Sequence, residues 1–171
     1  MTCIICDYAS GKVKTKKLYE DEDIIAVLNP TPAVFGHSLI FPKKHFTIIQ
    51  QAPEEIVKKM FHVAQQISGI IFDALGAEGT NVMLNEGFVA GQKHAHVLIH
   101  VIPRKKDDGL GFEWPQKQIP EESMNRIYEL LKVPEGKTAE KPLKEAEPLK
   151  TEEKKDISKE DFRIKQLRRI P

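Results

Sequence analysis

The pattern of apolar and polar residues predicts several short strands in the first half of the chain. Residues 17–20 and 24–28 are predicted as the two strands of a hairpin, because each is rich in strand formers and an acidic turn separates them. A loop follows in which two prolines exclude regular sheet pairing. The apolar run 38–41, which Pro42 closes, and the run 80–84 are predicted as further strands.

The segment 53–75 has the period of a helix. Its apolar residues recur at steps of three and four, so they would lie along one face. Pro53 suits the first helical position, the glutamates after it suit the positive end of the helix dipole, and Gly76 or Gly79 can end the helix. A second, shorter helix is predicted over residues 121–131.

The most unusual stretch carries three of the six histidines, which are His94, His96 and His100. Residues 95–102 are almost wholly apolar or β-branched, which predicts a strand. The histidines and Leu98 would then share one face, and the residues between them would share the core face. Imidazole nitrogens need hydrogen-bond or metal partners. Three histidines on one face of a strand therefore favour a functional site over an ordinary core face.

The length of the chain and its net charge exclude several classes of protein. The chain has 171 residues, enough for one domain with a real core, and its net charge of +1 gives no general attraction to nucleic acid or membrane. No apolar run reaches the ~18 residues of a membrane-spanning helix, and the N-terminus lacks the basic and apolar regions of a signal peptide. We therefore expect a cytoplasmic protein that makes no membrane contact.

The chain has two cysteines, Cys3 and Cys6. In a reducing cytoplasm they are not expected to form a structural disulfide. Two intervening residues let both sulfurs converge on one ion, so three possibilities remain open for this motif alone: half of a zinc site, a redox pair, or two small buried side chains.

The composition changes at Pro134. Residues 135–160 contain eight acidic residues, seven lysines and no aromatic residue, so they cannot bury enough apolar area to offset their ordering entropy. We divide the chain into a domain over 1–133, a charged, disordered linker over 134–157 and a short basic amphipathic segment over 158–171. That last segment would suit docking to a protein partner, to a second copy of the chain or to RNA.

Five sequence blocks follow one another along the domain. They are Gly36-His37, Pro42-Lys43-Lys44-His45, Asn85-Glu86-Gly87, Ala90-Gly91-Gln92 and the run from His96 to Pro103-Arg104. In order and separation they resemble the histidine triad (HIT) family of nucleotide-binding proteins and nucleotidyl hydrolases and transferases, over about residues 1–115. The resemblance implies an α+β fold with an antiparallel sheet of about five strands, one long helix packed on it, a shorter C-terminal helix and a homodimer.

The register of the triad decides what chemistry the resemblance implies. The spacing from Gly91-Gln92 makes His96 and His100 the first and third histidines, with Leu98 in the middle and His94 at a variable position. In the family the middle histidine attacks the α-phosphate and forms a covalent nucleotidyl intermediate. Leucine has no lone pair, so the resemblance implies a purine nucleotide-binding protein that lacks the standard covalent catalysis.

Three alternatives remain open. Another group, such as His94, His37 or an activated water, would support hydrolysis or transfer of phosphoramidates or dinucleoside polyphosphates. A scaffold protein would act through its C-terminal tail. A leucine introduced to trap a bound ligand would leave the same sequence.

By the resemblance, four residues would contact the nucleotide. Asn29 stands where the family usually has an acidic residue that binds the ribose hydroxyls, and its amide oxygen is a weaker acceptor than a carboxylate. Asn85 and Gln92 fall at positions that contact sugar or phosphate, although both would also serve in a turn. His100 would donate to phosphate oxygens, and His37 corresponds to a histidine that lies behind the nucleophile and orients it.

The resemblance also implies structural zinc. The zinc-binding branch of the family uses the two N-terminal cysteines, the histidine of the Pro-Lys-x-His block and the first triad histidine, which are Cys3, Cys6, His45 and His96 here. Four protein ligands would close a tetrahedral site, so this zinc would hold the N-terminus to the sheet rather than activate water.

Overall fold

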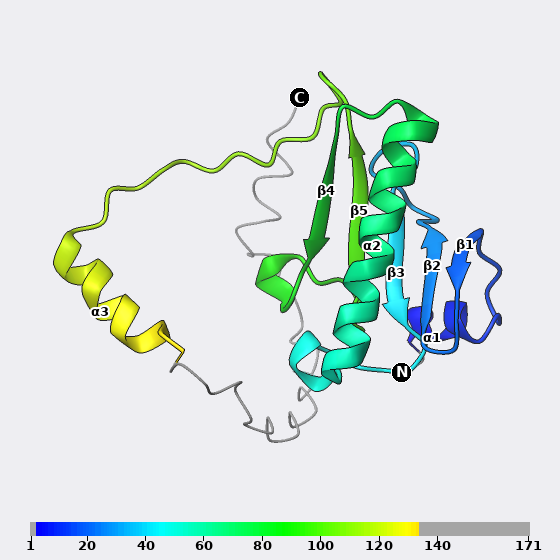
Figure 1. Cartoon of the computed structure of the whole chain (residues 1–171), viewed down its shortest axis with the longest axis horizontal. Coiled ribbons are helices and arrows are strands. Elements are labelled where there is room, and N and C mark those ends of the chain that lie inside the picture. The colour runs from blue at the N-terminus through cyan, green and yellow to red at the C-terminus, as the bar shows by residue number, and fades with distance from the viewer. Residues whose placement is uncertain (1–2, 134–171) are drawn as a thin grey trace, which may run out of the picture. The chain divides into compact units, whose positions relative to one another are not determined.

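Five antiparallel strands form one sheet in the order β1-β2-β3-β5-β4, which confirms the predicted α+β class (Figure 1). The structure is a computed structural model that describes residues 3–133, so the predicted linker 134–157 and basic segment 158–171 lie outside the described residues. The strands are β1 (Lys17–Glu20), β2 (Ile24–Leu28), β3 (Ser38–Pro42), β4 (Gly79–Leu84) and β5 (Ile99–Arg104).

The helices are α1 (Ile4–Ala9), α2 (Glu54–Leu75) and α3 (Glu121–Leu131). Helix α2 follows its predicted bounds, but Pro53 caps it in an extended conformation instead of forming its first turn. Gly76 ends it with a φ of 56°, a left-handed conformation that glycine adopts without strain. The sequence analysis missed α1, because a helix of six residues is too short to show a period or to be stable alone.

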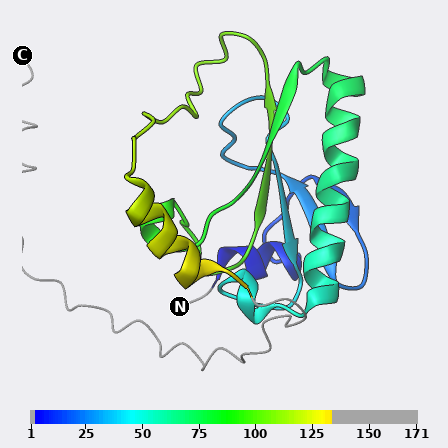
Figure 2. The same cartoon turned by 60° about the vertical axis from the view of Figure 1, so that its left-hand side comes forward.

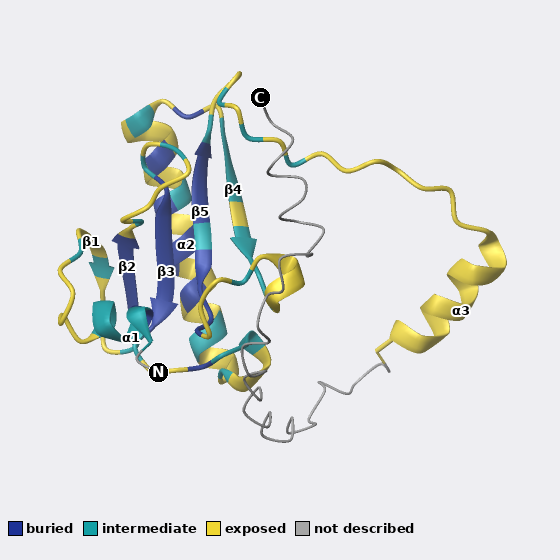
Figure 3. Ribbon diagram, turned by 180° about the vertical axis from the view of Figure 1, so that it is seen from behind, coloured by how far each residue is buried: buried dark blue, intermediate teal, exposed yellow. Residues whose placement is uncertain are grey.

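Two apolar clusters lie on the two faces of the sheet. Helix α2 runs along one face (Figure 2), where its periodic apolar stripe packs, and Ile5 of α1 packs on the other face. Because side chains alternate along a strand, β2 and β3 each supply both clusters, and the three central strands β2, β3 and β5 are mostly buried (Figure 3). The α2 cluster includes Ile24, Ile40, Met60, Val63, Ile67, Ile71, Val97, Ile99 and Val101, and the α1 cluster consists of Ile5, Ile25, Val27, Leu39, Phe41 and Leu98.

The predicted histidine strand was wrong in its extent. Regular pairing begins only at Ile99, because the backbone N–H of His96 turns back to the His94 carbonyl at 2.8 Å and that of Val97 donates to the Phe46 carbonyl at 2.7 Å. The predicted alternation of faces nevertheless holds through the irregular part. Val97 lies in the α2 cluster and Leu98 in the α1 cluster.

Helix α3 is present where its pattern predicts it, and none of its residues is buried (Figure 3). Its apolar positions, Met124, Ile127, Leu130 and Leu131, are all exposed. Within residues 3–133, no helix has both the length and the apolar content to cross a membrane.

Candidate functional site: a histidine cavity beside a metal-binding cluster

A cavity of about 350 Å³ lies on the face of the sheet opposite α2. In β5 and the residue before it, Leu98, His100 and Ile102 are spaced two apart and all line it. The residues directly opposite His100 in the neighbouring strands, Leu39 of β3 and Met83 of β4, line it as well. The four predicted nucleotide contacts, Asn29, Asn85, Gln92 and His100, all lie along its wall.

Two histidines form a hydrogen-bonded pair at the cavity. The Nε2 atom of His37 lies 3.0 Å from Nδ1 of His100, and the Ala33 backbone N–H donates to Nδ1 of His37 at 3.1 Å. Because Nδ1 of His37 accepts, its proton is on Nε2 and is donated to His100. Nδ1 of His100 therefore accepts, and Nε2, on the far side of the ring, carries the proton available to a ligand.

Burial keeps both rings neutral. It lowers the pKa of His37 below its usual value. It also lowers the pKa of His100 to about 4, with further repulsion from His37, Lys93 and His94. Near pH 7, His100 thus presents an uncharged N–H donor to the cavity.

Two of the predicted nucleotide contacts also form hydrogen bonds within the protein. The amide oxygen of Asn29 accepts the Thr31 backbone N–H at 3.1 Å, and its nitrogen lies 3.3 Å from Nδ1 of His37. The Gln92 side chain accepts the Gly87 N–H and donates to the Thr47 carbonyl, both at 2.8 Å. The Asn29 side chain therefore helps to hold His37 in place, and the Gln92 side chain holds the loop beside the cavity.

Leu98 is the residue that the resemblance places at the centre of the triad. It is only 8% exposed and packs in the α1 cluster, while its accessible atoms line the cavity. The side chain that faces a ligand here is thus a hydrocarbon without a lone pair. His94, which the sequence left unassigned, is exposed and lines the same cavity.

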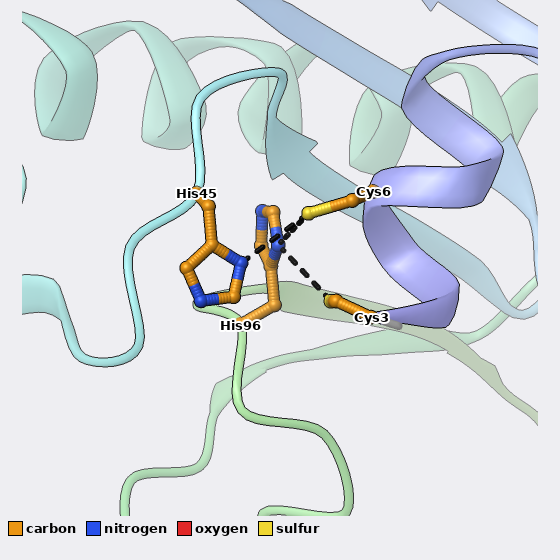
Figure 4. Close-up of side chains that lie close together, drawn as sticks. All are labelled: Cys3, Cys6, His45 and His96. Carbon is orange, nitrogen blue, oxygen red and sulfur yellow. Dashed lines mark hydrogen bonds between the residues drawn. The ribbon is translucent and has the colours of Figure 1, made fainter. Parts of the chain in front are cut away.

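The second cluster lies where the N-terminus meets the sheet (Figure 4). Cys3 and Cys6 come from the start of α1, His45 from the loop after β3 and His96 from the irregular segment before β5. One ligand atom from each residue lies within 4.8 Å of the other three. The sulfur of Cys6 lies 3.3 Å from Nδ1 of His45 and 3.5 Å from Nδ1 of His96, which is 3.6 Å from the sulfur of Cys3.

These distances fit one tetrahedral ion. With metal–sulfur bonds of ~2.3 Å and metal–nitrogen bonds of ~2.0 Å, sulfur and nitrogen ligands of a tetrahedral zinc lie about 3.5 Å apart. Nε2 of His96 donates to the Pro42 carbonyl at 3.0 Å, which leaves the lone pair of Nδ1 directed at the sulfurs. Burial lowers the pKa of His96 to about 4 and, with Cys3, raises that of Cys6 to about 11. A neutral His96 would bind a metal without losing a proton, whereas Cys6 would bind one only after its thiol lost a proton.

The cluster and the cavity share one segment of chain. His96 is held in the cluster, and Leu98 and His100, two and four residues later, line the cavity. A metal bound by His96 would therefore fix the position at which the segment enters β5. This arrangement connects the candidate metal ligands to the cavity through the chain, although none of the four lines the cavity.

Comparison with known proteins identifies the family. The HIT domain family matches residues 10–107, more than half of the chain. The chain belongs to the HIT family. This HIT protein is 35% identical over 122 residues to "Adenylylsulfatase HINT3" of Arabidopsis thaliana. The match covers 71% of this chain and 60% of that protein. The chain therefore spans less than two thirds of that relative.

For two further relatives, the match covers most of the relative's own length. "Adenosine 5'-monophosphoramidase hnt1" of Schizosaccharomyces pombe is 31% identical over 130 residues, 75% of this chain and 95% of that protein. The crystal structure of a Zn-bound histidine triad family protein from Mycobacterium smegmatis superposes with a TM-score of 0.62 at 34% identity, covering 68% of this chain and 85% of that one. Membership of the HIT family and the named relatives of Arabidopsis thaliana and Schizosaccharomyces pombe support a nucleotide-related function.

The residues that the sequence analysis grouped lie together in the structure, but one pairing among them was not predicted. All four predicted metal ligands converge in one cluster. The His37–His100 bond was not predicted, because it joins residues 63 positions apart and neither lies at a spacing that indicates the other. The resemblance implied that His37 would orient a nucleophile at position 98. In the structure, His37 forms a hydrogen bond with His100.

Proposed function

We propose that this HIT protein binds a purine nucleotide through the histidine cavity without forming a nucleotidyl-histidine intermediate. The observation that carries the proposal is the joint placement of His100 and Leu98 on one cavity wall. His100 offers a neutral, oriented N–H donor, which suits a phosphate oxygen. Leu98 stands where the covalent bond to phosphorus would form, and it cannot supply an electron pair.

The remaining wall supplies polar contacts of the kind a nucleotide needs. Asn85 lines the cavity, and its side-chain amide can both donate to and accept from sugar or phosphate. Asn29 holds His37 and retains one amide hydrogen for a ribose hydroxyl. The relatives whose names specify adenylyl sulfate and adenosine monophosphoramide favour an adenine nucleotide.

We further propose that Cys3, Cys6, His45 and His96 hold a structural zinc ion. Two thiolates and two imidazoles are a donor set that zinc prefers, and four protein ligands leave no position for water. When bound, the ion contributes folding energy and no Lewis-acid step. Support comes from the ligand distances and from the Zn-bound histidine triad protein of Mycobacterium smegmatis.

One alternative function rests on His94. This imidazole lines the same cavity as His100, so it is the described side chain best placed to replace the missing nucleophile. A hydrolase that used it would form a bond from a His94 ring nitrogen to the α-phosphorus as the amine of a phosphoramidate departs with a proton, and water would then cleave that bond. Turnover of an adenosine phosphoramidate that His94→Ala abolishes would favour this alternative.

The expected homodimer remains a proposal. β4 forms one edge of the sheet, and Phe61 and Phe72 of α2 are exposed, so both elements have unpaired surface for a second copy. Light scattering on the purified chain measures the oligomer directly. The docking role of the tail and the cytoplasmic location also remain predictions.

A thermal-shift series tests the proposed nucleotide binding. AMP, at saturating concentration, should raise the melting temperature of the protein more than adenosine does, because His100 is proposed to contact the phosphate. His100→Ala should remove this difference. His62→Ala is the matched control, because His62 is exposed on α2 and lies outside the cavity. Equal shifts with AMP and adenosine would overturn the phosphate role of His100.

A further inference from the structure

The wall of the histidine cavity is divided into a neutral part and a cationic part. Asn29, His37 and His100 form a hydrogen-bonded chain without formal charge. The cationic part is Lys93, which lines the cavity next to the His94 ring. Among the described residues, no aspartate or glutamate lines this cavity, so the cationic part has no acidic partner there.

The two parts suit different portions of an anionic ligand. The neutral His100 N–H contacts one phosphate by hydrogen bonding but adds no charge to balance it. A second anionic group needs a cation, and charge-assisted hydrogen bonds from lysine are stronger than neutral ones. Gln92, which precedes Lys93, is fixed at both ends of its amide, so the backbone that carries the lysine is held at the cavity.

We infer that Lys93 and His94 form a second anion subsite, so that the preferred ligand is a nucleotide with an anionic group beyond its first phosphate. This inference rests on the proposed nucleotide-binding function and specifies its ligand class. The first phosphate contacts His100, and the next phosphate or an equivalent anion contacts the Lys93 ammonium and the His94 ring. The subsite requires no bond making or breaking.

Calorimetric titration of the zinc-loaded full-length chain with AMP and with ADP tests the inference. ADP should bind about tenfold more tightly than AMP, because it adds one charge-assisted contact. This ratio should fall in Lys93→Gln and approach about 1 when His94→Gln is added. It should also fall with rising salt, because Lys93 is exposed to solvent. Lys105→Gln is the matched control, because Lys105 is exposed and lies outside the cavity wall.

The outcomes separate this inference from the proposed function. AMP binding with no preference for ADP overturns the second subsite and leaves the proposed function intact. A preference for ADP that persists in the double variant also overturns it, because the charge would then be bound elsewhere. Failure of both nucleotides to bind the folded protein overturns the proposed function and the subsite together.

Discussion

Nε2 of His37 lies 3.0 Å from Nδ1 of His100, and this contact sets the direction in which His100 can donate. His37 is itself fixed by the Ala33 backbone N–H, so the chain of bonds runs from the loop before β3 to the cavity. The orientation of His100 therefore depends on His37 and on the loop before β3. With Leu98 in the same cavity wall, His100 still presents an oriented N–H donor to the cavity.

The tautomers of this pair are directly measurable. Long-range proton–nitrogen spectra of the labelled imidazoles should show both rings neutral with the proton on Nε2 at pH 7. On acidification His100 should stay neutral until the pH approaches about 4, well below the value of about 6.5 for an exposed histidine. Titration of His100 near pH 6.5, or a proton on its Nδ1, would contradict the arrangement.

Acid should also destabilise the fold through these rings. The pKa of His37 and that of His100 are lower in the folded state than in the unfolded chain, so the unfolded state takes up more protons. Their contribution to stability is complete above pH ~6.5 and is lost as the pH falls toward about 4. Urea unfolding of His37→Asn should show a weaker pH dependence than the parent over this range, and an unchanged slope would count against the pair.

Removal of one metal ligand should lower both metal content and stability. Freshly purified protein should contain about one zinc per chain, and Cys3→Ser should lower that content and reduce the melting temperature by roughly 5 °C or more. His45→Ala should act in the same direction. His62→Ala, which removes an equally exposed histidine outside the cluster, should change neither quantity. Metal analysis that finds no zinc would refute the structural role.

Gly36 couples the histidine pair to the end of α2. Its φ is +87°, and an added Cβ would collide with the Leu75 side chain and lie 3.2 Å from Cγ of Pro103. Gly36→Ala should therefore destabilise the protein by about 1–3 kcal/mol and weaken nucleotide binding, since the next residue is His37.

The control for this substitution is Gly69→Ala in the middle of α2. A Cβ there meets no atom within 4 Å, and alanine is the better helix former by about 0.5–1 kcal/mol. Gly69→Ala should thus stabilise the protein. Denaturant unfolding gives the free energy of unfolding of both variants. Equal changes in the two variants would contradict the backbone constraint at Gly36.

Leu98→His restores the residue type that covalent catalysis requires. The parent protein, incubated with an adenosine phosphoramidate, should show no nucleotidyl adduct by intact-mass spectrometry, whereas Leu98→His should show one. The new side chain sits in an apolar cluster, so the variant should also lose about 1–3 kcal/mol of stability. An adduct on the parent chain would establish another nucleophile, and His94→Ala would show whether it is His94.

The sequence predicted an element correctly where one periodic pattern of apolar residues runs through the whole element. The steps of three and four placed α2, and alternation placed Leu98 and Val97 on opposite faces even outside the regular strand. The start of β5 could not be predicted, because the hydrogen bond from Val97 to the Phe46 carbonyl is a tertiary contact.

The sequence predicted which residues gather at the candidate site better than it predicted the hydrogen bonds between them. Family spacing grouped four candidate metal ligands, which lie in one cluster, and four residues that line the cavity. It could not show that Gln92 uses both ends of its amide on the Thr47 and Gly87 backbone, or that His37 bonds to His100. Such bonds depend on how loops from distant parts of the chain meet, and no local pattern encodes them.

Isothermal titration of AMP into the zinc-loaded full-length protein tests nucleotide binding at the histidine cavity most directly. One AMP should bind per chain, binding should be lost or severely weakened in His100→Ala, and His62→Ala should bind as the parent does. A folded, zinc-loaded protein that gives no binding heat with AMP over several temperatures, and does not bind ADP either, would contradict the proposed function and leave a scaffold role.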